Sequence, residues 1–368
     1  MNERKTIYVS VDYLKNFMKD VFIQCGVTAN DAEVCSDVLI TSDVRGIESH
    51  GIGRLKMYVD RIRAGQIIPG APLIIVRETP TTAVMDANHG LGMITGVKAM
   101  KTAIQKAKDY GMGAVAVRNS THYGIAGYYA MMAIQEGMIG LSLTNARPSI
   151  APTFGTQPML GTNPIAFAAP TDDIPFVLDA ATSIIQRGKV EIAERENHPI
   201  PEGLVIDQNG HSVTDPPAIL KGLVEETMAL LPLGGAGETG SGYKGYGLAT
   251  MVEILCSALQ TGTFLHGLSG FDSNGKDTFH RIGHFFMAIN IEAFTPLDEF
   301  KKITGSILRD LRNSRKEPGR TRIYTAGEKE FENEIKIRQF GVPIIPALQD
   351  QIKILQRDLN LTHYKFDF

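Results

Sequence analysis

The chain has 368 residues, more than one hydrophobic core usually spans, so its length predicts two domains or one domain with a large subdomain. Hydrophobic residues make up 43% and charged residues 21%, a balance that argues against disordered, fibrous and repeat-array classes. The net charge is −3, with 37 basic and 40 acidic residues interspersed, so no basic field draws the chain to nucleic acid or to an anionic membrane. A small molecule is the favoured partner.

The N-terminal residues and the cysteines bear on location. No apolar run approaches the roughly 20 residues of a membrane-spanning helix, and no apolar stretch like that of a secretion signal follows the polar start. We therefore expect a cytoplasmic protein. The three cysteines, Cys25, Cys35 and Cys256, form no CxxC pair and lie among apolar residues at helical spacing, which predicts buried thiols.

The first third of the chain is predicted to be mostly helical. Ser10 and Thr28 are suited to cap two helices, and a third helix is expected to follow Ser49. Two segments with the alternating pattern of a strand and one amphipathic segment typical of a helix come next. The predicted helices are 10–26, 28–46, one after 49, and 96–110, and the predicted strands are 73–77 and 82–86.

From residue 111 to about residue 270, short strand-like runs are separated by Gly and Pro, which indicates a second domain built on a sheet. The dense prolines of residues 148–175 exclude a helix there and indicate rigid loops. The predicted strands are 114–117, 139–144, 165–168, 176–178 and 285–291, and the predicted helices are 126–134, 248–259, 297–312 and 348–359.

The first candidate site surrounds His50. On a helical wheel, His50 and Arg54 lie one turn apart on the side opposite the apolar stripe, and Tyr58 flanks them. Ser49 is expected to cap this helix, and a helix N-terminus with an arginine one turn inside suits a carboxylate. Gly51 destabilises a helix relative to alanine, which makes sense where another backbone or a ligand must come close. The alternative is a solvated polar face.

The second candidate is His122, which lies between a buried-looking strand and the predicted helix 126–134. Side chains at a strand-to-helix turn tend to point into a cleft, and a nearby helix N-terminus disfavours the imidazolium form. A neutral histidine there suits a general base. The alternative is a histidine that only caps the helix or fills a corner.

The third candidate is Lys244, which lies between glycines just before the predicted helix 248–259. A lysine at the start of a helix has good access to an anion such as a phosphate. The alternative is a flexible surface loop.

Two further patterns are weaker. The glycines of residues 235–240 match GxGxxG, but the preceding run is short and broken by a proline, and no acid lies near position 260 to hold a ribose. We therefore predict no Rossmann fold. His280 and His284 have a spacing compatible with zinc, yet no cysteine pair accompanies them, and we expect no metal there.

Five segments together resemble the type-2 malate/L-lactate dehydrogenase family, in the same order and over nearly the whole chain. They are 43–51, 119–127, 161–167, 178–183 and 242–247, and the shorter matches 188–191, 200–203 and 327–330 extend them. Members of this family are NAD(P)-dependent oxidoreductases that act on malate, lactate, sulfolactate, ureidoglycolate, diketogulonate or cyclic imino acids.

The resemblance implies an α/β (α+β-like) fold with a non-Rossmann NAD(P)-binding domain on a largely antiparallel sheet, plus a helical domain. Residues 1–118 and 295–368 would form the helical substrate and dimerisation domain, and residues 119–294 the NAD(P)-binding domain. The protein would be a homodimer.

The resemblance also implies roles for the first two candidate sites. His122 would exchange a proton with the substrate hydroxyl, and His50 would be a second acid/base or orienting group. Arg54 would hold the substrate carboxylate, with Ser49 and Tyr58 close to it.

For the cofactor, the resemblance implies NAD, with NADP possible. The residues implied are Ala146, Asp179, Ala180, Ala181, Lys244, Gly327 and Glu328. Arg147 lies beside this set where relatives often have a small or acidic residue, so the choice between NAD and NADP stays open.

We therefore expect a 2-hydroxyacid dehydrogenase, with malate and oxaloacetate as the first pair to test. A second substrate carboxylate needs a second cation or a cluster of N–H donors, for which Arg45, Arg118, Arg147 and the helix end at Ser49 are candidates. The alternatives are a lactate, sulfolactate or ureidoglycolate dehydrogenase, a cyclic imino acid reductase, or a catalytically silent ligand-binding homologue. From another class, a metal-dependent hydrolase would use His280, His284 and an acid such as Asp272.

Overall fold

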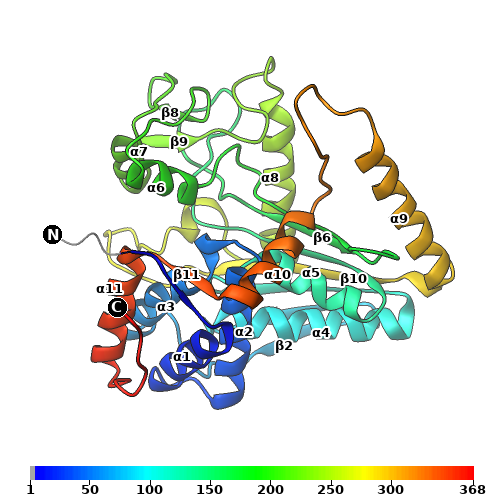
Figure 1. Cartoon of the computed structure of the whole chain (residues 1–368), viewed down its shortest axis with the longest axis horizontal. Coiled ribbons are helices and arrows are strands. Elements are labelled where there is room, and N and C mark those ends of the chain that lie inside the picture. Colours follow the sequence, from blue (N-terminus) through cyan, green and yellow to red (C-terminus); the bar gives the residue numbers. More distant parts are fainter. Residues whose placement is uncertain (1–4) are drawn as a thin grey trace.

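The computed structural model describes residues 5–368 and is organised around a seven-stranded sheet (Figure 1). The strand order is β2-β3-β4-β10-β5-β6-β7; β3 and β4 run parallel, and the other neighbouring strands are antiparallel. The strands are β2 (Ile74–Glu78), β3 (Thr82–Asp86), β4 (Met112–Ser120), β5 (Met138–Thr144), β6 (Ile165–Ala169), β7 (Phe176–Ala180) and β10 (Ile282–Asn290). The prediction of a mixed α/β fold with a largely antiparallel, non-Rossmann sheet is confirmed.

The centre of the sheet is formed by β4 and β10, whose apolar residues alternate in burial. Val115, Val117 and Phe286 have no exposed surface, because α4 (Gly92–Tyr110) and α5 (Ala126–Gln135) cover this face. The opposite face carries α8 (Gly242–Ser257), which contacts β4, β5 and β10 (Figure 1). A side chain at Gly113 would place its Cβ 2.1 Å from the carbonyl oxygen of Ala103, so α4 packs directly on the sheet backbone.

A helical layer with its own core joins both ends of the described chain. Ser10 Oγ and Thr28 Oγ1 accept the predicted capping hydrogen bonds from the backbone N–H groups of Tyr13 and Asp31, at 3.3 Å each. Residues near the two ends meet in a small two-stranded sheet, seen at the left of Figure 1. The elements are β1 (Ile7–Val9), α1 (Val11–Gln24), α2 (Ala29–Val44), α3 (Leu55–Arg63), α10 (Glu328–Phe340), β11 (Val342–Ile344) and α11 (Pro346–Asp358).

A third region, at the top of Figure 1, has a separate apolar core that includes Val190, Val205, Ile219 and Leu230. The sequence pattern predicted none of its short elements. They are α6 (Arg187–Arg195), β8 (Val205–Asp207), α7 (Pro216–Val224) and β9 (Met228–Leu230). The chain then enters α8 at Gly242, six residues before the predicted start, so Lys244 lies within this helix.

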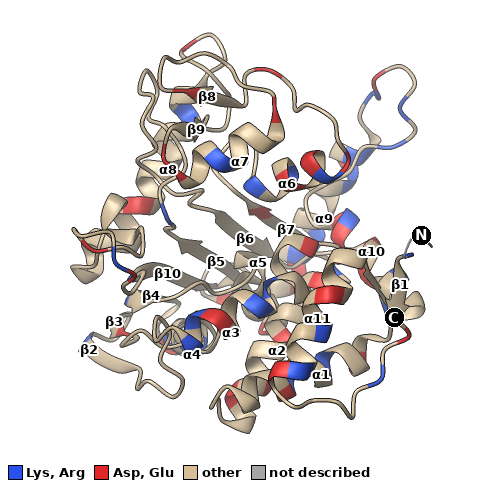
Figure 2. Ribbon diagram, turned by 90° about the vertical axis from the view of Figure 1, so that its left-hand side faces the viewer, with Lys and Arg blue, Asp and Glu red and all other residues tan. Residues whose placement is uncertain are grey.

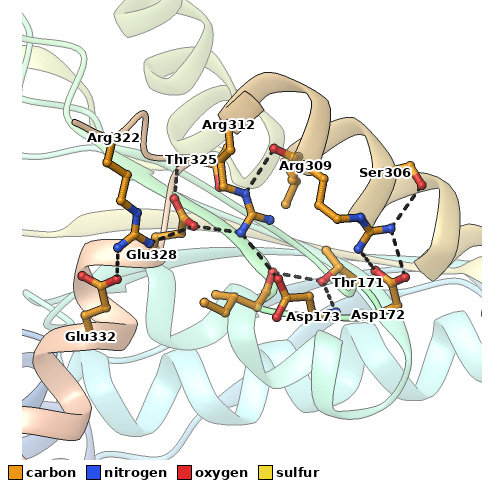
Figure 3. Close-up of polar contacts among 12 residues, drawn as sticks. Thr171, Asp172, Asp173, Ser306, Arg309, Arg312, Arg322, Thr325, Glu328 and Glu332 are labelled. Carbon is orange, nitrogen blue, oxygen red and sulfur yellow. Dashed lines mark hydrogen bonds and ion pairs between the residues drawn. The ribbon is translucent and has the colours of Figure 1, made fainter. Parts of the chain in front are cut away.

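The helix α9 (Leu297–Asn313) is anchored by ion pairs at the edge of the main sheet (Figure 3). The guanidinium of Arg309 donates a hydrogen bond at 2.8 Å to Asp172, which lies in the turn between β6 and β7. The guanidinium of Arg312 donates to Glu328 at 2.9 Å. Gly305 has no side chain, which lets Asp172 approach α9 closely. Short 3₁₀ turns complete the fold: η1 (Glu48–His50), η2 (Ile52–Arg54), η3 (Ala258–Gln260), η4 (Leu265–Leu268) and η5 (Ile291–Ala293).

The main sheet crosses the expected domain edge at residue 118, because β2 and β3 precede it and β5, β6 and β7 follow it. The division into 1–118 with 295–368 and 119–294 stays a prediction. Acidic and basic residues are interspersed along the ribbon (Figure 2). Within residues 5–368, no helix is both long enough and apolar enough to cross a bilayer.

Candidate active site

His122 lies in the turn between β4 and α5, as predicted. Its backbone is held by the start of α4, where Thr121 Oγ1 accepts a hydrogen bond from Gly92 N and donates one to Gly90 O, both at 3.0 Å. A Cβ on Gly92 would come within 2.7 Å of the His122 carbonyl oxygen. The peptide that carries His122 is therefore fixed by close packing rather than by a mobile loop.

One ring nitrogen of His122 is engaged and the other is free. Tyr58 Oη lies 2.6 Å from Nδ1 and also donates to the His122 carbonyl oxygen at 3.4 Å. Gly124 N donates to the same Nδ1 at 3.4 Å. Nε2 has no hydrogen-bond partner in the described part of the chain. It is also not fully buried, so it is accessible to a ligand. Burial, with smaller effects of His50, Arg54 and Arg61, holds the His122 pKa well below its usual value.

His50 lies against His122. The two rings stack with centroids 5.5 Å apart and an interplanar angle of 25°. Ser49 Oγ lies 2.8 Å from His50 Nδ1. Burial and the positive charge of Arg54 lower the His50 pKa to about 4. Both rings are therefore neutral near pH 7, the form that accepts a proton.

The predicted helix after Ser49 is wrong in its start. Two 3₁₀ turns, η1 and η2, precede α3, and Ser49 makes no side-chain cap, so His50 and Arg54 do not occupy successive turns of one α-helix. The cause is Asp43, a buried residue whose Oδ2 accepts from Ile52 N at 2.8 Å. A Cβ on Gly51 would overlap the Asp43 carboxyl group, which explains the glycine.

The segment still brings together the residues expected to bind a carboxylate. Arg54 Nε donates to the Ser49 carbonyl oxygen at 2.6 Å, which leaves both terminal nitrogens of the guanidinium available. Among residues 5–368, no carboxylate forms an ion pair with Arg54. The resulting constellation of Ser49, His50, Arg54, Tyr58 and His122 is a compact polar site supported by the helical layer on one side and by the sheet on the other.

A separate pocket of about 270 Å³ brings together two of the residues expected to bind the cofactor, Asp179 at the end of β7 and Gly327 before α10. Asp179 Oδ2 accepts from Gly127 N at 2.7 Å, at the start of α5. Gly327 has φ = 95°, and a Cβ there would lie 3.1 Å from Val177. The walls combine backbone, the carboxylates of Asp179 and Glu330 and the cations of Arg45 and Lys329, a mixed polar surface of the kind a dinucleotide contacts.

The carboxylate of Glu328 faces away from this pocket. It is 1% exposed and accepts hydrogen bonds from Arg312 at 2.9 Å, Arg322 at 3.3 Å and Thr325 N at 2.7 Å (Figure 3). Glu328 thus fixes the pocket wall. Its expected contact with the cofactor stays a prediction.

The other residues expected to bind the cofactor lie outside the residues that line this pocket. Ala180 ends β7 and Ala181 follows it. Ala146 lies just after β5, close to Gly161. Lys244 is exposed on the first turn of α8, with its ammonium group 5.8 Å from the Tyr243 ring centre. The roles of all four stay predictions.

His284 has a structural environment. Thr144 Oγ1 lies 2.8 Å from Nδ1, Ser120 Oγ lies 2.8 Å from Nε2, and the Tyr123 ring stacks on it with centroids 4.4 Å apart. The His280 ring lies instead beside Gly270. Within the described residues, no three His, Cys, Asp or Glu side chains gather as a metal site. The geometry does not favour the hydrolase alternative.

Sequence reasoning missed the supports of His122, namely Thr121 and Gly92, and the basic residue Arg61. A signal existed for Arg61, since its spacing from Arg54 and Tyr58 follows one face of a helix. Two of the arginines suggested for a second carboxylate are engaged elsewhere. Arg118 pairs with Asp86 at 2.8 Å, and Arg45 lies 3.7 Å from Glu334.

Comparison with known proteins identifies the family. The family model described as malate/L-lactate dehydrogenase matches residues 9–353. The malate dehydrogenase of Pyrococcus abyssi is 46% identical over 355 residues, which are 96% of each chain. The L-sulfolactate dehydrogenase of Methanocaldococcus jannaschii is 40% identical over 362 residues, which are 98% of this chain and 96% of that protein.

Solved structures give the same result. A crystal structure of malate dehydrogenase from Entamoeba histolytica superposes with a TM-score of 0.95 at 44% identity, covering 99% of this chain and all of that one. Malate dehydrogenase from Pyrococcus horikoshii has a TM-score of 0.87 at 41% identity, with 98% and 99% coverage. The expectation of an oxidoreductase that acts on 2-hydroxy acids is confirmed, and the chain belongs to the malate/L-lactate dehydrogenase family.

Proposed function

We propose that this protein is an NAD-dependent malate dehydrogenase that interconverts malate and oxaloacetate. One observation carries the proposal: Nε2 of His122 is free beside an unpaired arginine, while Nδ1 is held by Tyr58 at 2.6 Å. A neutral imidazole with one bare nitrogen is the group that takes the hydroxyl proton of a 2-hydroxy acid. The relatives named malate dehydrogenase support the choice of substrate.

The contacts of His122 suggest how its ring is set for this step. In the tautomer with the hydrogen on Nδ1, Tyr58 Oη accepts it at 2.6 Å while its own hydrogen goes to the His122 carbonyl oxygen, and the 3.4 Å approach of Gly124 N to Nδ1 is then not a hydrogen bond. That arrangement leaves the lone pair on Nε2, which receives the proton during oxidation and returns it during reduction. Burial raises the Tyr58 pKa, so the phenol stays neutral throughout.

Arg54 would bind the carboxylate adjacent to the reacting carbon with its two free terminal nitrogens, a bidentate contact that orients C2. Its bond to the Ser49 carbonyl oxygen fixes the guanidinium plane before the substrate arrives. His50 stacks on His122 and would restrict its ring. A protonated His50 would repel a protonated His122, so the low His50 pKa favours proton uptake at His122.

A nicotinamide cofactor, when bound, supplies the hydride acceptor or donor for C2. The pocket between β7 and α10 has the polar and backbone groups to hold part of such a molecule. The exposed carboxylate of Asp179 suits a ribose hydroxyl, which supports NAD over NADP.

A homodimer and a cytoplasmic location complete the proposal. Two helices present apolar side chains to solvent at helical spacing, a pattern typical of surfaces that are covered in an assembly. These residues are Leu248, Met251 and Ile254 on α8, and Ile303, Ile307 and Leu311 on α9. Light scattering coupled to size exclusion would give twice the chain mass for a dimer.

The test is absorbance at 340 nm with purified protein, NADH or NADPH, and a panel of oxaloacetate, pyruvate, sulfopyruvate, glyoxylate and a cyclic imine. We expect the fastest oxidation with NADH and oxaloacetate. A different acid responding best would replace the substrate and keep the mechanism. Failure of every substrate would contradict the proposal.

A further inference from the structure

One face of α3 carries three residues in line with the active site. Arg54 immediately precedes the helix with helical φ and ψ, Tyr58 lies four residues on and Arg61 three more, so the three share a face. The rise of about 1.5 Å per residue separates the two arginines by roughly 10 Å along the axis. Tyr58 is thus centred between two cations.

This face is turned toward His122, because Tyr58 Oη lies 2.6 Å from its Nδ1. The charges of Arg54 and Arg61 both contribute to the lowered pKa of His122, which places both guanidinium groups within electrostatic reach of the ring. Along this face, Arg54 and Arg61 therefore lie on either side of Tyr58, the residue that contacts His122.

Arg61 has no charge partner. In the part of the chain that the structure describes, its side chain makes no ion pair and no hydrogen bond. Its neighbours on α3 are paired, since Lys56 contacts Asp60 at 2.6 Å and Arg63 contacts Asp358 at 3.6 Å. Arg61 is partly buried, so leaving its charge uncompensated has a cost.

A further arginine, Arg147, acts electrostatically on Arg61. Burial, Arg54 and Arg147 all lower the Arg61 pKa, and Tyr58 raises it. Arg61 and Arg147 in turn help to lower the pKa of the buried His280. Arg61 on α3 and Arg147 in the segment after β5 thus form a positive region; the nearby Asp277 acts on His280 and forms no ion pair with either arginine among the described residues. Such a region is stabilised by a bound anion.

We propose that Arg61 binds the distal acid group of a diacid substrate, while Arg54 binds the carboxylate next to the reacting carbon. This inference rests on the proposed function and deepens it by naming the residue that selects diacids over monoacids. Arg147 is less suited to the role, because it donates to the Val224 carbonyl oxygen and lies over the Phe271 ring.

The experiment compares oxaloacetate with pyruvate in wild type, Arg61→Gln and Arg61→Lys. Loss of a desolvated charge contact should lower kcat/KM for oxaloacetate by about 30-fold or more, mainly through KM, while pyruvate loses less than about 5-fold. Arg61→Lys should recover part of the preference, because it keeps the charge without the fork. Arg63→Gln is the matched control: it removes the same charge from the same helix and should leave the preference unchanged.

Equal losses for the two substrates in Arg61→Gln would overturn the inference and assign Arg61 a structural role. A wild type inactive with every 2-oxo acid would instead refute the proposed function. In that case calorimetric titration with succinate decides the Arg61 inference separately. Succinate should bind to wild type and to Arg63→Gln with similar affinity, and at least about 10-fold more weakly to Arg61→Gln, if the inference is right. No binding to wild type, or equal affinity in all three proteins, overturns it.

Discussion

His122, in the turn after β4, and His284, on β10, are two buried histidines with different proposed roles: proton transfer for His122 and structural support for His284. Thr144 and Ser120 occupy both ring nitrogens of His284, and Tyr123 covers one of its faces. His122 has Tyr58 on Nδ1, and no residue among 5–368 hydrogen-bonds to its Nε2. Burial lowers the pKa of both rings. A depressed pKa therefore does not distinguish them; the unoccupied nitrogen does.

The largest expected effect comes from removing the free nitrogen. His122→Asn should lower kcat by about 10²–10⁴-fold, because the proton acceptor is lost, while the melting temperature barely changes. Initial rates at 340 nm and circular dichroism measure the two quantities. His198→Asn is a matched control on an exposed histidine. Near-normal turnover of His122→Asn would move the proton role to His50.

The opposite result is expected for His284. Truncating it to alanine leaves the buried hydroxyl of Ser120 without a partner and opens a cavity beside Tyr123, at a cost of about 2–4 kcal/mol in the free energy of unfolding. Urea denaturation measures this loss. The folded fraction should retain far more activity than His122→Asn does. Unchanged stability with lost turnover would remove the distinction between the two histidines.

Tyr58→Phe tests the hydrogen bond that orients His122. Loss of one such bond, worth about 1.4 kcal/mol, should lower kcat about 10-fold with little change in stability. The drop should fall on kcat more than on KM, since the phenol contacts His122. A change confined to KM would return Tyr58 to a substrate-binding role, as the family resemblance implied.

The smallest effect is on the pH dependence of stability. Burial lowers the His284 pKa to about 3. As pH falls, the unfolded chain therefore takes up a proton on this ring at a higher pH than the folded protein does. The stabilisation is complete above the unfolded pKa of about 6.5 and is lost progressively as pH falls toward 3. From about pH 7.5 to about pH 5.5 this group alone should cost about 1 kcal/mol. His284→Gln should flatten that part of the curve in urea titrations, and an unchanged slope would argue against a neutral buried ring.

Local patterns predicted much of the fold and part of the site. Thr82–Asp86 forms β3 with the predicted bounds, and its residues alternate between buried and less buried positions. The position of His122 just after β4 was predictable because a buried apolar run ends shortly before it. These features depend on neighbours in sequence, so periodicity finds them.

What was missed depends on residues distant in sequence. The turns around His50 replace a helix because Asp43, on another helix, binds Ile52 N and fills the space beside Gly51. Arg118 was a candidate for substrate binding, but Asp86 on the neighbouring strand neutralises it. No pattern within either segment signals such pairings.

The place of β10 in the sheet bears on how the chain acquires its structure during synthesis. Phe286 pairs with Val115 on one side and with Ser142 on the other, so the last sheet strand in chain order fills the middle. Until residues 282–290 leave the ribosome, β4 and β5 have no partner between them and expose two apolar edges. Such non-local pairing slows folding and leaves the nascent chain prone to aggregation. We expect chaperones to matter most in that interval, and His284 to join Ser120 and Thr144 only at its end.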